Sequence, residues 1–284
     1  MKEIFELEWM GGAAEHHYRK AVPGVEDLPW GTLDTRDYAP EVVDAARMTW
    51  TRSSLTEYRA VAGFSEVLRN CAEAKAPLDV IGMASSFVAD EVLHTELACR
   101  MAMELGGGAP LETDLDHLFA PIDRSLTAFQ RANEVVLRVS GVAEAFSTKM
   151  AAKSLAATTH PLTRAVLERI VADESLHYRL SGVYFDWAAS YMDDAERARL
   201  GKIATECLRP YATCPAARPK VADPMAAGRA RATVDQIRSI GWLEAKTFPG
   251  QVRDAVRNGI VGPLARYGIV VAEETVDAWF GAAS

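Results

Sequence analysis

The chain has 284 residues, of which 49% are hydrophobic and 25% are charged, as is typical of a globular protein with an apolar core. Its formal net charge of −8 argues against binding to nucleic acid, which requires a basic surface. No stretch approaches the length of an apolar membrane span, and the first residues lack the apolar core of a signal peptide, so we expect a cytoplasmic protein with no membrane partner.

The first 75 residues are predicted to form an arm followed by a long helix. Prolines and glycines interrupt residues 1–38, so we expect an irregular N-terminal arm there. Pro40 fits the first turn of a helix, and nothing breaks that helix before about Ala74. A second helix is predicted from near Pro77 to the glycine triplet at residues 106–108.

Three further helices are predicted in the middle of the chain. The third covers about residues 125–158, and the fourth covers about residues 161–192. Asp193 or Asp194 is suited to cap a fifth helix, which we expect to end near Arg209, before a proline. No segment shows the alternation of a strand, so the sequence predicts an all-α protein in which four long helices form a bundle.

The C-terminal quarter is predicted to be an extension of the bundle. Residues 210–228 contain four prolines and are predicted to be a linker, and shorter helices should follow and pack on the bundle. The expected organisation is therefore an arm over 1–38, a bundle plus one helix over 39–209, and an extension over 210–284.

The cysteines exclude one class of metal site. The four of them form no C-x-x-C pair, so neither a zinc ribbon nor a rubredoxin module is encoded. Cys207 and Cys214 are close enough in sequence to bridge a turn, but in a reducing cytoplasm we expect free thiols.

The string V-A-D-E-x-L-H-x-x-L occurs twice, on the second and on the fourth predicted helix. Glu91 and His94 are three residues apart, as are Glu174 and His177, so each pair shares one face of its helix. Apolar residues continue both faces, and a carboxylate and an imidazole in an apolar core are costly unless they are paired or bound to a cation. A structural hydrogen bond would explain one such pair, whereas two pairs in a repeated string indicate metal binding.

A site for two metal ions needs about six protein ligands, so two carboxylates are missing from the repeated pairs. Glu57 and Glu144 lie mid-helix on the preceding helices, where an antiparallel hairpin brings each one level with its partner motif. Glu66 would require a tighter hairpin than the predicted turn allows, and Glu134 lies almost three turns before Glu144.

The order Glu, E-x-x-H, Glu, E-x-x-H on four successive helices resembles the ferritin-like di-iron carboxylate proteins over about residues 40–192. The resemblance implies a ferritin-like four-helix bundle that holds two iron ions, or one manganese and one iron. Carboxylates with one imidazole for each metal ion suit iron or manganese, whereas thiolates would suit zinc. The ligands implied by the resemblance are Glu57, Glu91, His94, Glu144, Glu174 and His177.

An aspartate precedes the glutamate in both copies of the string. The resemblance implies that Asp90 and Asp173 do not bind the metal ions but orient the histidine ligands. Each would accept a hydrogen bond from the histidine on the opposite helix, Asp90 from His177 and Asp173 from His94. The alternative is that both are polar residues on a helix surface.

Several functions of the family fit the sequence poorly. Storage ferritins generally lack a complete second E-x-x-H, and rubrerythrin-type peroxidases usually carry a rubredoxin segment. Ala98 stands where radical-storing reductase subunits need a tyrosine, and Ile170 stands where arylamine N-oxygenases have a third histidine. The resemblance then implies a di-iron oxygenase or oxidase that activates O₂ to oxidise a small organic substrate.

The electrons for such a reaction are expected from a separate reductase or ferredoxin, because the chain has no flavin, nicotinamide or iron–sulfur motif. Homodimer formation is left open. The main alternative is a ferroxidase or peroxide-scavenging protein without an organic substrate. A third alternative is a binding protein that retains the bundle without turnover.

Small and polar residues near Glu144 are the sequence's indication of a substrate pocket. The resemblance implies that Thr148, one turn after Glu144, is a catalytic residue; alternatively, its hydroxyl binds its own helix backbone. The neighbouring small residues would leave room beside the metal ions, or would simply permit close helix packing; they are Ser140, Gly141, Ser147 and Ala151.

Overall fold

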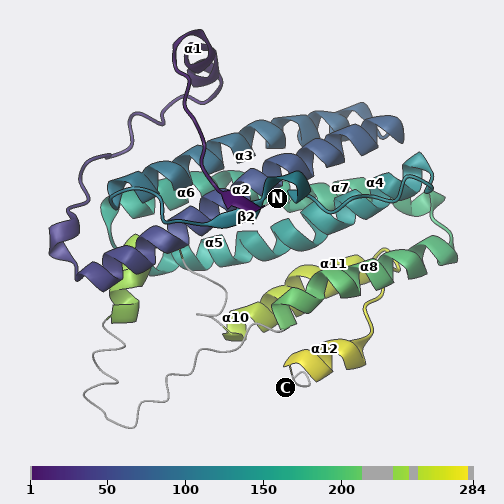
Figure 1. Cartoon of the computed structure of the whole chain (residues 1–284). Coiled ribbons are helices and arrows are strands. Elements are labelled where there is room, and N and C mark those ends of the chain that lie inside the picture. Colours follow the sequence, from purple (N-terminus) through teal and green to yellow (C-terminus); the bar gives the residue numbers. More distant parts are fainter. Residues whose placement is uncertain (1, 213–232, 243–248, 281–284) are drawn as a thin grey trace.

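The computed structural model describes residues 2–212, 233–242 and 249–280 (Figure 1). The fold is all-α, which confirms the predicted class. Within the described residues, strands are confined to β1 (Lys2–Ile4) and β2 (Glu112–Asp114), which form one antiparallel pair. Every described helix is too short or too polar to cross a membrane.

The first long hairpin consists of α2 (Pro40–Glu73) and α3 (Leu78–Glu104), as the sequence predicts. Pro40 occupies the first turn of α2, where its missing N–H costs no helical hydrogen bond. The turn after α2 places Lys75 in the left-handed region, at a φ of 55°. The two helices pack against each other along their length, so residues far apart in sequence become neighbours.

The third long helical stretch is continuous but not uniform. It begins at α4 (Ala128–Val136), passes through the π-helical segment η3 (Leu137–Glu144) and ends in α5 (Ala145–Ala157). Thr127 and Gln130 form a reciprocal capping box at its start. The extent agrees with the predicted helix over 125–158, but the π-helical segment was not predicted.

The fourth long stretch consists of α6 (Pro161–His177), α7 (Arg179–Ala188) and the short η4 (Ala189–Tyr191). The break after His177 has an identifiable cause. The Ser140 hydroxyl donates to the carbonyl oxygen of His177 at 2.6 Å and accepts from the backbone N–H of Ser181 at 2.9 Å. This side chain therefore inserts between a carbonyl and an N–H that would bond each other in an uninterrupted α-helix.

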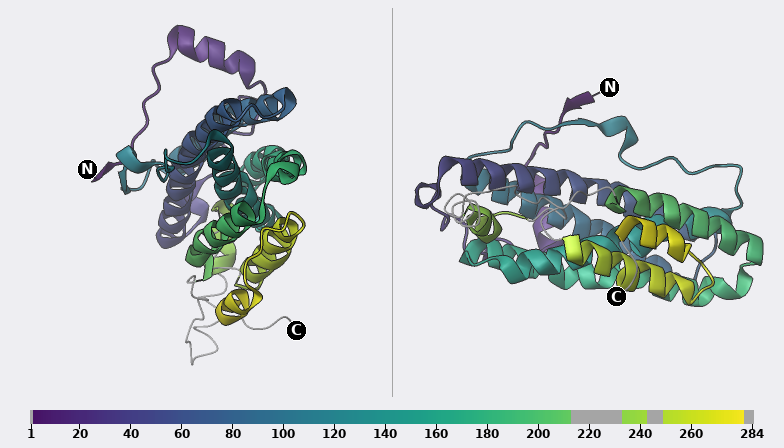
Figure 2. Two further views of the ribbon diagram at one scale, coloured as in Figure 1. Left: turned by 90° about the vertical axis from the view of Figure 1, so that its right-hand side faces the viewer. Right: turned by 90° about the horizontal axis from the view of Figure 1, so that it is seen from below.

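The four long stretches lie side by side (Figures 1 and 2). α2 contacts α4, α5 contacts α6, and α3 contacts both α6 and α7. Two apolar clusters fill the interior, one containing Phe87 and the other containing Leu93. Glu91, one of the predicted ligand positions, lies between these two residues on α3 and so marks the boundary between the two clusters.

The N-terminal arm is more ordered than predicted. Residues 1–38 include the helix α1 (Gly12–Ala21), so the prediction of an irregular arm is wrong there. In Figure 2, α1 stands apart from the long helices. Arg19 of α1 forms an ion pair of 2.7 Å with Glu96 of α3, and such long-range contacts are not visible in local sequence patterns.

The chain continues into α8 (Asp194–Ala212), whose first turn is capped by the carboxylate of Asp193. Pro210 lies inside the last turn of α8, so the predicted end near Arg209 is two to three residues early. Residues 213–228 of the predicted linker lie outside the described residues, as does Cys214. Cys71, Cys99 and Cys207 are free thiols.

Short helical segments follow over the C-terminal part. A helical stretch covers residues 233–240, where the Ile240 carbonyl accepts a hydrogen bond from the Trp50 indole at 2.8 Å. The last described segments are α10 (Pro249–Asp254), η6 (Ala255–Val261), α11 (Gly262–Ala265) and α12 (Glu273–Phe280). Two of them, α10 and η6, contact α5.

Candidate metal centre

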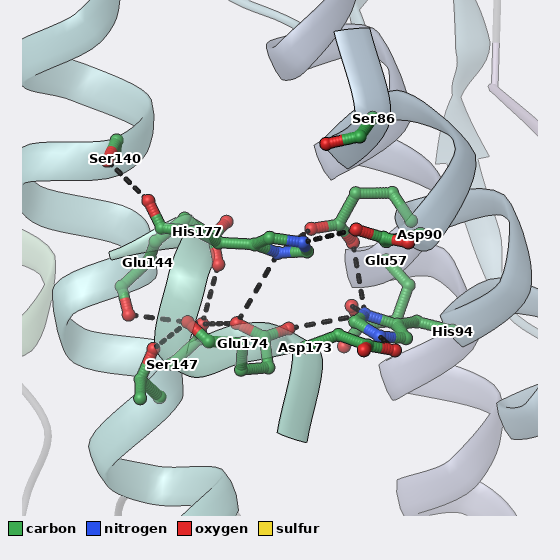
Figure 3. Close-up of polar contacts among 12 residues, drawn as sticks. Glu57, Ser86, Asp90, His94, Ser140, Glu144, Ser147, Asp173, Glu174 and His177 are labelled. Carbon is green, nitrogen blue, oxygen red and sulfur yellow. Dashed lines mark hydrogen bonds and ion pairs between the residues drawn. The ribbon is translucent and has the colours of Figure 1, made fainter. Parts of the chain in front are cut away.

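Both copies of the repeated string contribute to one buried cluster. Glu91 and His94 of α3 face Glu174 and His177 of α6, and one possible ligand atom from each lies within 4.8 Å of the others (Figure 3). Their exposed fractions are at most 2%. The cluster is therefore a candidate metal site enclosed by the protein.

Each of the two glutamates in this cluster has one carboxylate oxygen near each of the two histidines. The Glu91 carboxylate places Oε1 2.9 Å from His177 Nδ1 and Oε2 3.6 Å from His94 Nδ1. The Glu174 carboxylate places Oε1 3.3 Å from His94 Nδ1 and Oε2 3.9 Å from His177 Nδ1. Each carboxylate therefore faces the Nδ1 atoms of both histidines and could contribute to a metal site beside either one.

The two remaining predicted ligands flank the cluster. Glu57 is 6% exposed and has its Oε2 3.8 Å from His94 Nδ1. Glu144 is 5% exposed and accepts a hydrogen bond of 3.1 Å from Ser147, whose hydroxyl is also 3.4 Å from Glu174. The structure thus brings together all six predicted ligand positions, with Glu57 beside His94 and Glu144 linked to Glu174 through the Ser147 hydroxyl.

The alternative carboxylates point elsewhere and have cationic partners. Glu66 binds Arg69 on the same helix and also accepts from Asn70. Glu134 binds Arg138 at 2.8 Å and Arg199 at 2.6 Å. Neither glutamate contributes to the buried cluster.

The aspartate of each string lies beside the histidine on the opposite helix. His177 Nε2 donates to Asp90 Oδ2 at 3.3 Å, and His94 Nε2 lies 3.5 Å from Asp173 Oδ2 (Figure 3). A proton held on Nε2 leaves the Nδ1 lone pair free, and Nδ1 is the atom that faces the glutamates in both histidines. Asp90 therefore fixes the tautomer of His177 that a metal ligand requires, and the negative charge of Asp173 favours the same tautomer of His94 across 3.5 Å.

We expect Asp173→Asn to weaken metal binding about 10- to 100-fold, because the amide stabilises the required orientation of His94 less well than a carboxylate. Asp79→Asn is the matched control, since Asp79 lies in the first turn of α3, away from the cluster. Competition titration with a metal-sensitive dye measures the affinity of each variant. Equal affinities of the two variants would show that Asp173 does not support the site.

Several buried polar atoms of the cluster lack, among the described residues, the hydrogen-bond partners that a purely structural cluster would need. Both Glu91 oxygens and the Nδ1 atoms of His94 and His177 make no hydrogen bond to any residue that the structure describes. Each such group costs about 1–3 kcal/mol if it is left unsatisfied. Four glutamates and two neutral histidines carry a formal charge of −4, which two divalent cations neutralise. The donor set therefore fits two metal ions.

The ionisation of the metal-free cluster reflects burial and mutual repulsion. Burial, together with repulsion from Glu91 and Glu174, raises the pKa of Glu57 to about 8. The pKa of Glu144 is also raised well above its ordinary value, by burial and by the neighbouring glutamates. Burial alone would lower the pKa of His177, but Asp90 and Glu91 outweigh it and raise that pKa to about 9.

The metal-free protein should therefore lose stability as the pH rises. Glu57 has a pKa of 4.5 without the fold and about 8 within it, so its protonation stabilises the folded chain most fully below pH 4.5. This contribution disappears as the pH rises through 8, and that of His177 disappears between 6.5 and about 9. We expect the Tm of the metal-free chain to fall from pH 5 to pH 9.

Glu57→Gln should flatten this dependence, because glutamine resembles the protonated glutamate at every pH. Differential scanning fluorimetry of both metal-free proteins measures the Tm. A wild-type Tm that rises over this range, or a glutamine variant with an unchanged slope, would contradict the assignment of Glu57 to the coupled cluster.

A cavity of about 460 Å³ adjoins the cluster on the side of Glu57 and Glu144. Its walls are mainly apolar and come from α2, from the loop before α4, and from η3 and α5. They include Phe119, Val139 and Met150. Such a volume lies within the range of about 300–1,000 Å³ that is typical of small-molecule sites.

The small residues near Glu144 have different positions. Ser147 lines the cavity and binds the carboxylates, a role that the sequence reasoning did not assign to it. Thr148 does not line the cavity; its hydroxyl donates to the carbonyl oxygen of Glu174 at 3.2 Å, across to the next helix instead of within its own. Gly141 faces Leu137 and Ser181, so it permits helix packing. Of the four small residues predicted to leave room beside the metal ions, Ser147 lines the cavity, whereas Ser140, Gly141 and Ala151 do not, so the prediction is wrong for these three.

No protein-family model, no curated protein and no solved structure matches this chain. The chemistry of the site must accordingly be argued from its own geometry.

Proposed function

We propose that the chain is a ferritin-like di-iron oxygenase or oxidase that uses O₂ to oxidise a small organic substrate. One observation carries the proposal: Glu91 and Glu174 each extend one carboxylate oxygen toward each of two histidines. Bridging carboxylates hold two ions close together, which is the arrangement that the ferritin-like bundles place between facing helices.

Six residues would hold the two ions. Glu57 and His94 would hold one ion, Glu144 and His177 would hold the other, and Glu91 and Glu174, which face both histidines, would be shared by the two. Four carboxylates with two imidazoles favour iron, or a manganese–iron pair, over metals that prefer thiolates. Bound in reduced form, the pair supplies the electrons and the open coordination positions that O₂ activation requires.

The remaining side chains orient the ligands and exclude water. Asp90 and Asp173 hold the imidazoles with their Nδ1 atoms inward. Ser147 donates to Glu144 and lies within reach of Glu174, so it restrains both carboxylates on the side of the cavity. Phe64 and Phe87 pack edge-on or tilted against His177, with ring centroids 5.2 and 4.4 Å away, and shield the cluster.

The cavity favours an oxygenase over a ferroxidase or peroxide scavenger. Iron and peroxide need only a narrow polar path, whereas a cavity of about 460 Å³ with mainly apolar walls suits an organic molecule. Because the chain has no motif for a second redox cofactor, the electrons for turnover would come from a reductase or a ferredoxin.

The reaction with O₂ tests this proposal. We expect the iron-loaded, chemically reduced chain to consume O₂ rapidly in a stopped-flow experiment with an oxygen electrode. Glu57→Ala should slow this consumption at least about 100-fold, the effect expected for the loss of a ligand that positions a reacting centre. Glu66→Ala should leave it unchanged, because Glu66 binds Arg69 outside the cluster. Equal rates for the two variants would exclude a reactive centre at Glu57.

A further inference from the structure

Arg59 presents a positive charge at the mouth of the cavity. It lies on α2, it is exposed, and it lines the same cavity as Glu57 and Glu144. Nη2 of Arg59 donates to the hydroxyl of Thr113 at 3.0 Å. Within the part of the chain that the structure describes, Arg59 has no carboxylate partner.

The contact with Thr113 positions the guanidinium without neutralising it. Thr113 is 4% exposed and belongs to β2, which is held by β1, so the hydroxyl is a fixed and uncharged anchor. Arg138, another arginine of the cavity wall, differs because it is paired with Glu134. Arg59 therefore keeps donors available on a planar group that matches the two oxygens of a carboxylate.

The cavity lining combines two buried carboxylates, an exposed arginine and several apolar side chains. Glu57 and Glu144 belong to the candidate metal centre, whereas Arg59 is exposed at the surface. The apolar part of the lining includes Phe119, Val139 and Phe146. A ligand that contacts both Arg59 and the metal centre would carry an anionic group, an apolar body and a reactive carbon remote from the anionic group.

We propose that the substrate is an apolar monocarboxylic acid whose carboxylate binds Arg59 and whose apolar body extends toward Glu57 and Glu144. This inference rests on the proposed function, because it names the substrate class of the same site. A monoanionic carboxylate balances the one positive charge of Arg59, which a phosphate dianion would exceed. Binding in this orientation directs the end remote from the carboxylate toward the metal ions.

Calorimetric titration of the anaerobic, iron-loaded protein with octanoate and with octanamide tests the inference. The two probes share an apolar chain and differ in the charge at one end. We expect octanoate to bind wild type about tenfold more tightly than octanamide, which is the preference that one charge-assisted hydrogen-bonded pair provides. Arg59→Gln should abolish this preference while octanamide affinity stays the same.

Arg69→Gln is the matched control, since Arg69 lies on the same helix but pairs with Glu66 outside the cavity. It should retain the preference for octanoate. Persistence of the preference in Arg59→Gln would assign the carboxylate to another cation of the cavity, either a metal ion or Arg52, and overturn the inference, as would tighter binding of octyl phosphate than of octanoate. Failure of wild type to bind iron and to consume O₂ would instead overturn the proposed function.

Discussion

We expect the replacement of Glu91 with alanine to abolish metal binding at the proposed two-metal centre. Glu91 lies at 0% exposure between the two histidines, with one oxygen 2.9 Å from His177 Nδ1 and the other 3.6 Å from His94 Nδ1. A single substitution therefore deletes one ligand from each ion and leaves the other carboxylates to repel one another. We expect iron content to fall from about two ions per chain to well below one.

Glu168→Ala is the control for this experiment, because Glu168 is exposed on α6 and pairs only with Arg164 among the described residues. It should retain both ions. Circular dichroism of both variants checks that the helices remain. If Glu91→Ala keeps two ions while folded, Glu91 is not a bridging ligand and the proposed arrangement of the centre is wrong.

Filling the cavity should separate substrate oxidation from O₂ consumption. Ala143 lines the cavity next to Glu144 and has no polar side chain, so Ala143→Leu adds bulk without removing a hydrogen bond. We expect this variant to bind two iron ions and to consume O₂, yet to form at least about tenfold less product, because the added methylene groups occupy the space that the substrate needs.

Ala152→Leu is the matched control, since Ala152 is exposed on α5 and does not line the cavity. It should resemble wild type in iron content, O₂ consumption and product. A ferroxidase would oxidise bulk Fe²⁺ equally well with either substitution. Undiminished product from Ala143→Leu would show that the substrate does not occupy this cavity.

The sequence predicted the long helices because proline and glycine mark their ends. Pro40 and Pro161 begin α2 and α6, and the glycines after Glu104 follow the end of α3. Pro210 was the exception. It lies two residues from the end of α8, where the lost backbone hydrogen bond disturbs little remaining helix.

The cluster of Glu91, His94, Glu174 and His177 was predictable because each pair is local and its three-residue spacing fixes a shared helix face. The hydrogen bonds of Ser140 were not predictable, since they join residues 37 and 41 positions apart. The π-helical segment before Glu144 was also missed. Helix register there depends on contacts with neighbouring helices, which leave no periodic signal in the sequence.

The cavity residues were the least predictable part of the site. Ser147 was included only as a small residue, and Arg59 had no distinguishing pattern around it. The roles of both depend on contacts with other elements: Ser147 lies near Glu174 of α6, and Arg59 binds Thr113 of β2. Local spacing identifies what shares a helix face, whereas only the packed structure shows what surrounds a cavity.

Elemental analysis of the wild-type chain after anaerobic reconstitution with ferrous iron measures the stoichiometry of the centre directly. Six buried ligand positions with a formal charge of −4 lead us to expect about two iron ions per chain, retained after removal of unbound metal. A chain that is fully folded yet holds one zinc ion, or no metal at all, would contradict a di-iron centre.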